Sequence, residues 1–200
     1  MEKFHFNLNL LLNDIWEMLK EGVEKSKSDF HLATFCTISK DKPKNRTVVL
    51  RRVIRERNIL IFHTDKRSGK IYEINSNPNI SWLFYSHSNK VQLRLEGEAV
   101  IYSSGKLFED QWNSTALMSK KCYLIDHTPS SILKHPEVYL NSYSHFNNIS
   151  IEDSQIGKEN FAVIETKINS IDWLYLKSSG HIRAKFDLVN ERMQGKWLVP

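Results

Sequence analysis

Residues 45–70 read Asn-Arg-Thr-Val-Val-Leu-Arg-Arg-Val-Ile-Arg-Glu-Arg-Asn-Ile-Leu-Ile-Phe-His-Thr-Asp-Lys-Arg-Ser-Gly-Lys, and this stretch decides the predicted fold. Two runs rich in β-branched and aromatic residues, Arg46–Val53 and Asn58–Thr64, are separated by a charged turn. The pattern predicts two neighbouring strands. A helix is predicted to begin directly afterwards, because Ser68 is a good N-cap residue and apolar residues follow it at helical spacing.

The end of this stretch also predicts a phosphate-binding site. A helix that begins after Ser68 presents unpaired backbone N–H groups and the positive end of its dipole. Lys70 adds a cation at the same place, and Arg46 adds another at the start of the first strand. A β-hairpin followed by a short helix is common in α+β domains, so the pattern alone leaves a purely structural role open.

More strands are predicted along the rest of the chain. They cover Leu32–Ser39, Ile80–Ser86, Val91–Tyr102, Phe161–Ile168, Ile171–Lys177 and His181–Leu188. Turns are predicted at Asp41–Lys44, where Pro43 stops a ladder, and at Gln194-Gly195. Gly97 interrupts the longest strand and predicts a bulge or a close approach by another backbone. Short strands at this spacing favour a barrel or a sandwich.

Helices are predicted between and before these strands. Apolar residues at helical spacing predict an amphipathic helix over Asn7–Lys27. A second helix, capped by Ser103 or Ser104, should run to Met118, and a third should cover Glu137–Asn147. Lys120–Pro136 and Asn148–Glu159 are predicted as loops. The apolar stripes of these helices indicate packing against the sheet.

Length and composition favour one globular domain over residues 1–200. The net charge of +5 is modest and acids lie among the bases, which favours a solvated surface over nucleic-acid binding. No apolar run reaches the length of a membrane span, and no secretory signal is recognisable. Cys122, His127, His135 and His145 fit no standard zinc spacing. We therefore expect a cytoplasmic protein with reduced cysteines, no membrane segment and no metal ion.

The order of the motifs resembles the pyridoxamine 5'-phosphate oxidase family. That family shows Arg-x-Val-Leu-Leu-Lys, then Tyr-Thr, then Ser-Arg-Lys, where this chain has Arg46–Arg51, His63-Thr64 and Ser68-Gly69-Lys70. Asn77-Pro78 after the short helix, the strand Val91–Gly97 and the final hairpin continue the resemblance. It implies a mainly β fold with flanking helices, the FMN-binding split β-barrel. It also implies a homodimer with FMN at the subunit interface.

The resemblance further implies which residues bind the cofactor. Arg46, Ser68 and Lys70 would hold the FMN phosphate, and Arg51 and Gln92 would face the ring edge, where negative charge develops on reduction. The implied cofactor-binding residues are Arg46, Thr47, Val48, Val49, Leu50, Arg51, His63, Thr64, Ser68, Gly69, Lys70, Gln92, Tyr175 and Lys185. The implied catalytic residues are His181 and Arg183, which would position the substrate. Trp173 could wall the flavin slot, although burial tendencies favour a core position.

Several departures from the family pattern predict an altered substrate site. Gly69 stands where the family has Arg, so one phosphate cation is missing. His181 and Arg183 exchange the order of the family's Arg and His, and Lys185 replaces an Arg, which loses the bidentate fork. The family's Tyr, Arg and Ser that bind the substrate phosphate have no match around Trp112. We therefore predict FMN binding with weak or absent oxidation of pyridoxamine phosphate.

The sequence leaves three functions open. The first is a dimeric FMN-dependent oxidoreductase that acts on a small molecule the sequence does not name. The second is a non-catalytic protein that binds FMN in order to store or sense it. The third is a nucleic-acid or protein-interaction module built on the same barrel. Tight FMN binding separates the first two functions from the third, and turnover separates the first from the second.

Overall fold

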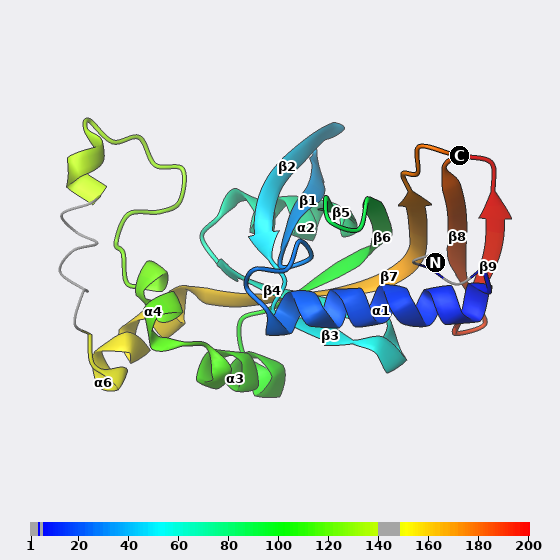
Figure 1. Ribbon diagram of the computed structural model, residues 1–200. Helices are drawn as coiled ribbons and strands as arrows, with labels where there is room; N and C mark the ends of the chain where they lie inside the picture. Colours follow the sequence, from blue (N-terminus) through cyan, green and yellow to red (C-terminus); the bar gives the residue numbers. More distant parts are fainter. Residues whose placement is uncertain (1–3, 5, 140–148) are drawn as a thin grey trace.

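A computed structural model describes residues 4, 6–139 and 149–200 of the chain. One antiparallel sheet forms the body, and helices lie along it and at one end (Figure 1). The strands are β1 (Leu32–Ser39), β2 (Lys42–Val49), β3 (Arg52–Ile54), β4 (Ile59–Asp65), β5 (Asn79–Ser86), β6 (Val91–Tyr102), β7 (Phe161–Tyr175), β8 (Ile182–Val189) and β9 (Arg192–Leu198). Their order is β2-β1-β5-β6-β7-β4-β3, with β8 paired to β7 and β9 to β8. The predicted mainly β fold with flanking helices is confirmed.

The strand β7 spans 15 residues and connects the two halves of the sheet. Its first half pairs with β4 and its second half with β8, while β6 pairs along its other edge. The sequence predicted two strands here, Phe161–Ile168 and Ile171–Lys177, and this prediction is wrong. The pairing shifts register between Glu96 and Gly97, so that Asn169 is accommodated as an extra residue and the strand continues through a bulge.

Gly97 lies where the backbones of β6 and β7 approach closely. A Cβ atom at this position would lie 2.0 Å from the carbonyl oxygen of Lys167, which is far inside van der Waals contact. The sequence predicted either a bulge or a close approach at Gly97, and the structure shows both. Because Gly97 has no side chain, β6 can pair with β7 along the whole length of β6.

Two predicted turns lie inside strands instead. Pro43 belongs to β2, which pairs only with β1, and an edge strand tolerates a residue without an N–H group. The β1–β2 turn is formed one step earlier, by Lys40 and Asp41 with φ angles of 47° and 63°, as a type I′ hairpin requires. Gly195 belongs to β9, where a Cβ atom would lie 2.6 Å from the Phe186 ring. The glycine thus makes room for an aromatic ring and forms no turn.

The N-terminal helix α1 (Leu8–Glu24) agrees with the predicted helix except at its last turn. The Asn7 side chain caps it by accepting hydrogen bonds from the N–H groups of Asn9 and Leu10. In Figure 1 α1 lies along the sheet and reaches the β8–β9 hairpin. The short helix α2 (Gly69–Ser76) begins after Ser68, as predicted. None of the helices in the described part of the chain is long and apolar enough to cross a lipid bilayer.

The segment between β6 and β7 contains more helices than predicted. The single helix expected up to Met118 is divided into α3 (Gly105–Ser114) and α4 (Leu117–Lys120). The expected loop over Asn148–Glu159 contains α6 (Ile151–Ser154) and a 3-10 helix, because Ser150 and Asp153 form a capping box. The predicted helix Glu137–Asn147 falls largely outside the described residues.

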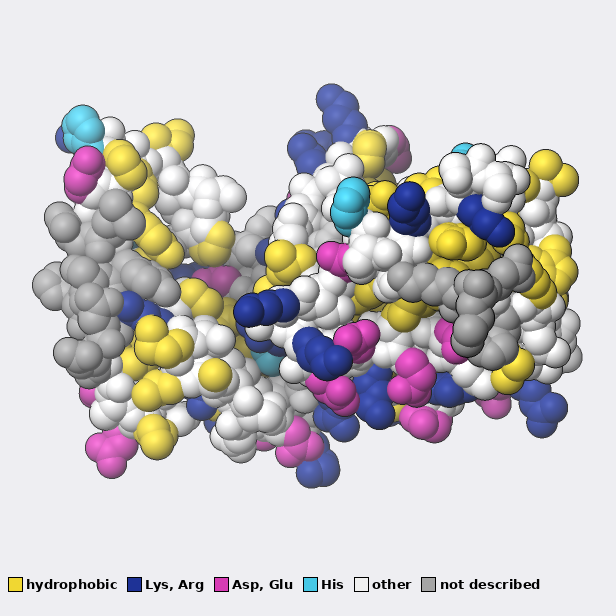
Figure 2. Space-filling view, viewed as in Figure 1, with side chains coloured by type: hydrophobic (Ala, Val, Ile, Leu, Met, Phe, Trp, Pro, Cys, Tyr) yellow, Lys and Arg dark blue, Asp and Glu magenta, His cyan; other side chains and the backbone are white. Residues whose placement is uncertain are grey.

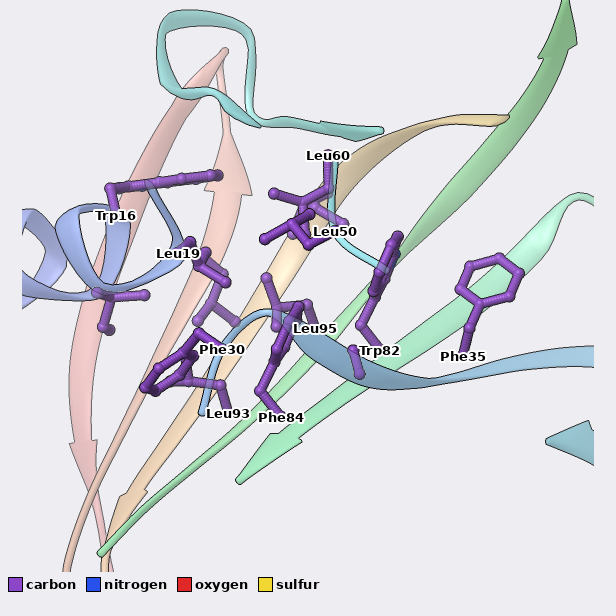
Figure 3. Packing of buried hydrophobic residues seen from close by; sticks show 14 of the residues in the cluster. Trp16, Leu19, Phe30, Phe35, Leu50, Leu60, Trp82, Phe84, Leu93 and Leu95 are labelled. Atoms are coloured by element: carbon purple, nitrogen blue, oxygen red, sulfur yellow. The ribbon is translucent and has the colours of Figure 1, made fainter. Parts of the chain in front are cut away.

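Buried aromatic and aliphatic side chains fill the space between α1, α2 and the inner face of the sheet (Figure 3). Trp82 stacks on Phe84 with ring centroids 5.7 Å apart and meets Phe35 edge-on. A smaller cluster around Trp112 and Phe161 joins α3 to the other face of β4 and β7. Trp173 is 1% exposed and belongs to the main core, in line with its burial tendency.

Replacing Gly97 with alanine should destabilise the protein strongly, because the new Cβ atom would collide with the Lys167 backbone. We expect a loss of about 2–3 kcal/mol or more, equivalent to a fall in Tm of roughly 5–10 °C. Gly69→Ala is the matched control, since the nearest atom to its Cβ would be the Glu73 side chain at 3.8 Å. Equal melting temperatures for the two variants would contradict the close approach.

Candidate functional site

A lysine and two hydroxyl groups meet where β4 ends and α2 begins. The Lys70 Nζ atom donates hydrogen bonds to Thr64 Oγ1 at 2.8 Å and to Ser68 Oγ at 3.0 Å. The two hydroxyl oxygens lie 3.3 Å apart, and both residues are buried. The Ser68 side chain makes no capping bond to α2, so it is directed to this cluster instead. Three of the residues that the resemblance implied for cofactor binding, Thr64, Ser68 and Lys70, therefore lie side by side.

The Lys70 ammonium group is the available cation of this cluster. Burial lowers its pKa, and the positive charge of Arg46 lowers it further, while Glu73 and Asp65 act in the opposite direction. Within the described part of the chain, Lys70 forms no salt bridge. An ammonium group has three N–H donors, of which the two hydroxyls use two. The third donor, the hydroxyls and the first N–H groups of α2 together suit a phosphate or similar oxyanion.

Arg46 is close to this cluster but is already paired. Its Nη2 atom lies 2.5 Å from Glu73 Oε2, and its Nη1 atom donates to the Lys44 carbonyl at 2.8 Å. Nη1 also contacts the Thr37 hydroxyl, which in turn donates to Glu73. The sequence analysis missed Thr37 and Glu73. The sequence did contain one indication of Glu73: it lies three residues after Lys70 on the same helix. This spacing places the two side chains next to each other on the helix surface.

A second polar cluster lies on the opposite face of β4, because adjacent strand residues point to opposite sides. His63 Nε2 lies 3.0 Å from Gln111 Oε1, and Nδ1 lies 3.4 Å from the Thr115 hydroxyl. The imidazole meets the Phe161 ring edge-on at 4.9 Å. Burial lowers the pKa of His63 to about 4, and the Arg51 charge contributes to the shift. His63 is therefore neutral at pH 7 and acts as a hydrogen-bonding group.

Two clefts flank His63. One, of about 400 Å³, lies between His63–Asp65 and residues 122–139; Figure 2 shows the hollow between that segment and the barrel. The other, of about 430 Å³, is bordered by Leu50–Arg52, His63, Gln111 and Ser114–Ala116. Sequence reasoning did not find Gln111 and Thr115, although their spacing of four residues on one helix face was visible.

The remaining predicted site residues lie at the far end of the sheet. Thr64 pairs with Ala162 at the start of β7, whereas Gln92 and Arg183 both pair with Leu174 near its end. Residues 162 and 174 are twelve positions apart, and at about 3.3 Å per residue the separation along the strand is roughly 40 Å. One chain therefore does not bring the two groups of residues together.

The far-end residues have partners of their own. Arg183 binds Asp172 through Nε at 3.1 Å and Nη2 at 2.7 Å, and Arg94 binds the same carboxylate at 2.6 Å. These two cations hold the pKa of Asp172 below its usual range despite burial. Lys185 pairs with Asp187 at 3.0 Å, and His181 is exposed just before β8.

Tyr175 lies on the opposite face of the sheet from Gln92 and Arg183. It follows Leu174 in β7, so its side chain points to the face opposite Gln92. There its ring meets Phe4 at 5.2 Å and Trp173 at 6.1 Å, against the main core. Tyr175 and Gln92 of one chain therefore do not face a common slot.

The backbone next to Arg46 is also engaged. The N–H groups of Leu50 and Arg51 donate to the carbonyl oxygens of His31 and Ile61, each at 2.9 Å. Thr47, Val48 and Val49 pair with β1. β2 is an edge strand, so those of its N–H groups that point away from β1 could still serve as donors for a ring edge, beside the side chains. In the described part of the chain, no group of three or more His, Cys, Asp and Glu residues could hold a metal ion.

Residues 13–103 match the model of the family described as "Pyridoxamine 5'-phosphate oxidase, FMN-binding domain". The chain is related to this family. A pyridoxine/pyridoxamine 5'-phosphate oxidase of Psychrobacter cryohalolentis is 30% identical over 87 residues, which are 44% of this chain and 38% of that protein. An enzyme of the same name from Leptospira interrogans is 30% identical over 79 residues, which are 39% and 36% of the two chains. The chain thus matches well under half of the length of these relatives.

Two solved structures share the fold over nearly the whole chain. One is a pyridoxamine 5'-phosphate oxidase-related, FMN binding protein from Nostoc punctiforme, with a TM-score of 0.75, 19% identity, and coverage of 94% and 96% of the two chains. The other is PhzG from Burkholderia lata in complex with tetrahydrophenazine-1-carboxylic acid, with a TM-score of 0.73, 15% identity, and coverage of 94% and 92%. The predicted split β-barrel is therefore confirmed as the fold.

The loss of the pyridoxamine 5'-phosphate oxidase family's Arg at Gly69 is not compensated by Arg67. The Arg67 guanidinium pairs with Asp65 at 2.6 Å and donates to the carbonyl oxygens of Ile125 and Asp126. It therefore fixes the segment after α4 against the start of α2. The cluster at the start of α2 therefore keeps one cation, Lys70, without a carboxylate partner among the described residues.

The low pKa of His63 predicts a pH dependence of stability. Between pH 6.5 and about 4 the unfolded chain binds a proton that the folded His63 does not. The free energy of unfolding should therefore fall as the pH drops through this window. His63→Gln should remove up to about 3 kcal/mol of that fall, measured by urea unfolding at pH 7 and pH 4.5. The control is His135→Gln, because His135 is exposed and lies outside this cluster; the variant should keep the fall in stability seen in the wild type. Identical pH profiles for wild type and His63→Gln would contradict a neutral, buried imidazole.

Proposed function

We propose that this protein binds FMN and acts as an FMN-dependent oxidoreductase on a small molecule other than pyridoxamine phosphate. The observation that carries the proposal is the cluster of Lys70, Thr64 and Ser68 at the start of α2. Bound FMN would supply an acceptor for a hydride, which carries two electrons. The family match over residues 13–103 supports FMN as the ligand whose phosphate occupies this cluster.

The residues of the cluster suit a terminal phosphate group. Lys70 provides charge, Thr64 and Ser68 provide hydroxyl donors, and α2 provides backbone N–H groups and a positive dipole end. Arg46 contributes the positive electrostatic potential of its guanidinium. Its salt bridge with Glu73 also connects β2 to α2. Burial of Thr64 and Ser68 keeps water from competing with the ligand.

We further propose a homodimer with the flavin between its subunits. Gln92, Arg183 and Lys185 lie on the outer face of β6–β8, far along β7 from Lys70 of the same chain. A two-fold axis can bring that face of one subunit beside the Lys70 cluster of the other. The neighbouring strand β5 exposes Leu83 and Tyr85, which offers apolar surface for such a contact.

A non-catalytic flavin-binding role is the second candidate. It is favoured by Arg183, whose guanidinium is held by Asp172 in a bidentate pair and is not free to position a substrate. The two roles differ in the fate of the reduced cofactor. The test reduces the protein chemically and measures how fast candidate substrates re-oxidise its flavin. If none of them re-oxidises the bound flavin faster than free reduced FMN, the result supports storage or sensing.

The phosphate assignment predicts a difference between FMN and riboflavin. Lys70→Met should weaken FMN binding by about 1.5–3 kcal/mol, the usual range for a charged hydrogen bond, and leave riboflavin binding unchanged. Flavin fluorescence quenching measures both affinities. Lys66→Met is the matched control, because Lys66 is exposed, lies four residues from Lys70 and is not among the described hydrogen-bond partners of Lys70. If Lys70→Met lost equal affinity for FMN and riboflavin, or lost affinity for neither, the FMN phosphate would have to bind elsewhere.

The shared-site proposal predicts that FMN and assembly are linked. The chain mass is 23.5 kDa, so light scattering of the FMN complex should give twice that value. Tyr85→Glu on the exposed face of β5 should weaken both dimerisation and FMN binding, because a charge would be placed in the contact. A monomer that retains full FMN affinity would show that one chain builds the site alone.

A further inference from the structure

Glu73 places a carboxylate beside the Lys70 cluster. Its Oε2 atom accepts hydrogen bonds from Arg46 and from Thr37, each at 2.5 Å. Its Oε1 atom forms no hydrogen bond with any residue that the structure describes. This oxygen lies beside Gly69, the first residue of α2, at 3.8 Å from the point that a Cβ atom on Gly69 would occupy. One carboxylate oxygen is therefore open at the helix end where an oxyanion would bind.

The pairing of charges leaves this helix end with one net positive charge. Arg46 is offset by Glu73 and Arg67 by Asp65, while Lys70 has no carboxylate partner among the described residues. Burial lowers the pKa of Lys70 and the charge of Arg46 lowers it further, whereas Glu73 and Asp65 raise it. Both carboxylates therefore act on the ammonium group that would meet a ligand, and partial burial strengthens their effect because the local dielectric constant is low.

The other charged groups around α2 are in contact with water. The helix packs against β1 and β6. β1 contains no charged residue, and its Cys36 points away from α2 because it neighbours Thr37 on the strand. The exposed charged residues of β6, of β2 and of the turn before α2 are Arg94, Glu96, Glu98, Lys42, Lys44 and Lys66. Water and salt screen exposed charges, so the partly buried groups decide which anion the cluster accepts.

A phosphate monoester has two charge states near neutral pH. Its second pKa is about 6, so it carries one negative charge below that pH and two above it. Two negative groups that share a site repel each other unless one of them takes up a proton. The open Oε1 atom of Glu73 therefore opposes the second charge of a monoester, and it can accept a hydrogen bond from the P–OH group of the singly charged form. A phosphodiester carries a single charge throughout this pH range and avoids the repulsion.

We propose that Glu73 is a specificity-determining residue that tunes the Lys70 cluster to a singly charged phosphate group. Two kinds of flavin carry such a group: FMN in its monoprotonated form, and a flavin dinucleotide, in which each phosphate has one charge. The inference rests on the proposed flavin function, because it names the charge state of the phosphate that the same site takes. It makes the affinity for FMN depend on pH.

Calorimetric titration of the wild type with FMN, flavin adenine dinucleotide and riboflavin at pH 5.5 and pH 7.5 tests the inference. The monoprotonated fraction of FMN falls from about three quarters to about one thirtieth between these values. Apparent affinity follows the fraction of the competent form, so FMN should bind about tenfold to twentyfold more weakly at pH 7.5. The other two flavins have no phosphate that titrates in this range, and their affinities should change less than twofold.

Glu73→Gln removes the carboxylate charge and releases Arg46 from its salt bridge. At pH 7.5 this variant should bind FMN about tenfold more tightly than the wild type, and its FMN affinity should no longer fall with rising pH. Glu17→Gln is the matched control, because it makes the same change of charge at an exposed position of α1 and should keep the pH dependence of the wild type. The wild-type comparison at two pH values decides the inference even where Glu73→Gln fails to fold.

The outcomes separate this inference from the flavin function. FMN affinity that is equal or higher at pH 7.5, or that Glu73→Gln leaves unaltered, would overturn the inference while flavin binding stands. Binding of none of the three flavins would reject the proposed function and the inference with it. A dinucleotide that binds more tightly than FMN at pH 7.5 would identify the phosphodiester as the ligand group. A dinucleotide that binds more weakly there, with FMN weakened by rising pH, would identify the monoprotonated FMN phosphate.

Discussion

The hydrogen bonds of β7 to three other strands constrain the whole structure. β6 occupies one edge of β7, and β4 and β8 divide the other edge between its two ends. This arrangement depends on the close backbone approach at Gly97, where no side chain fits. It also separates the Lys70 cluster from Arg183 by most of the length of the strand. A binding site that requires both groups must therefore use two chains.

Pairing of charges decides which cations are available at the start of α2. Arg46 is held by Glu73 and Arg67 by Asp65, with distances of 2.5 Å and 2.6 Å. Both pairs are partly buried, and a cation removed from water needs such a partner. The first pair connects β2 to α2. Arg67 also donates to the Ile125 carbonyl oxygen, so it connects the turn between β4 and α2 to the segment after α4. Among the described residues, Lys70 has hydroxyl partners and no carboxylate partner, so its charge is not neutralised by such a pair.

The alternation of side chains along β4 places two chemically different environments next to each other. Thr64 faces α2 and Lys70, while His63 faces α3 and the cleft of about 430 Å³ bordered by Leu50–Arg52. The first environment has a cation and a helix N-terminus, and the second has a neutral imidazole and a helix C-terminus. The end of one strand thus presents a cationic environment on one face and an uncharged hydrogen-bonding environment on the other, because consecutive residues point to opposite faces.

Local sequence patterns predicted the strands β1 and β6, the end of β4 and the start of α2 after Ser68. They also predicted the close backbone approach at Gly97. Each of these features depends on neighbouring residues and on backbone sterics. The sequence also showed the order of the three motifs Arg46–Arg51, His63-Thr64 and Ser68-Gly69-Lys70. Only the tertiary structure decided that β7 is one strand, that Gly195 makes room for Phe186, that Glu73 neutralises Arg46, and that Gln111 meets His63. These features join residues far apart in the chain, so no local pattern records them, and the free energy of each contact exists only once the sheet has brought its partners together.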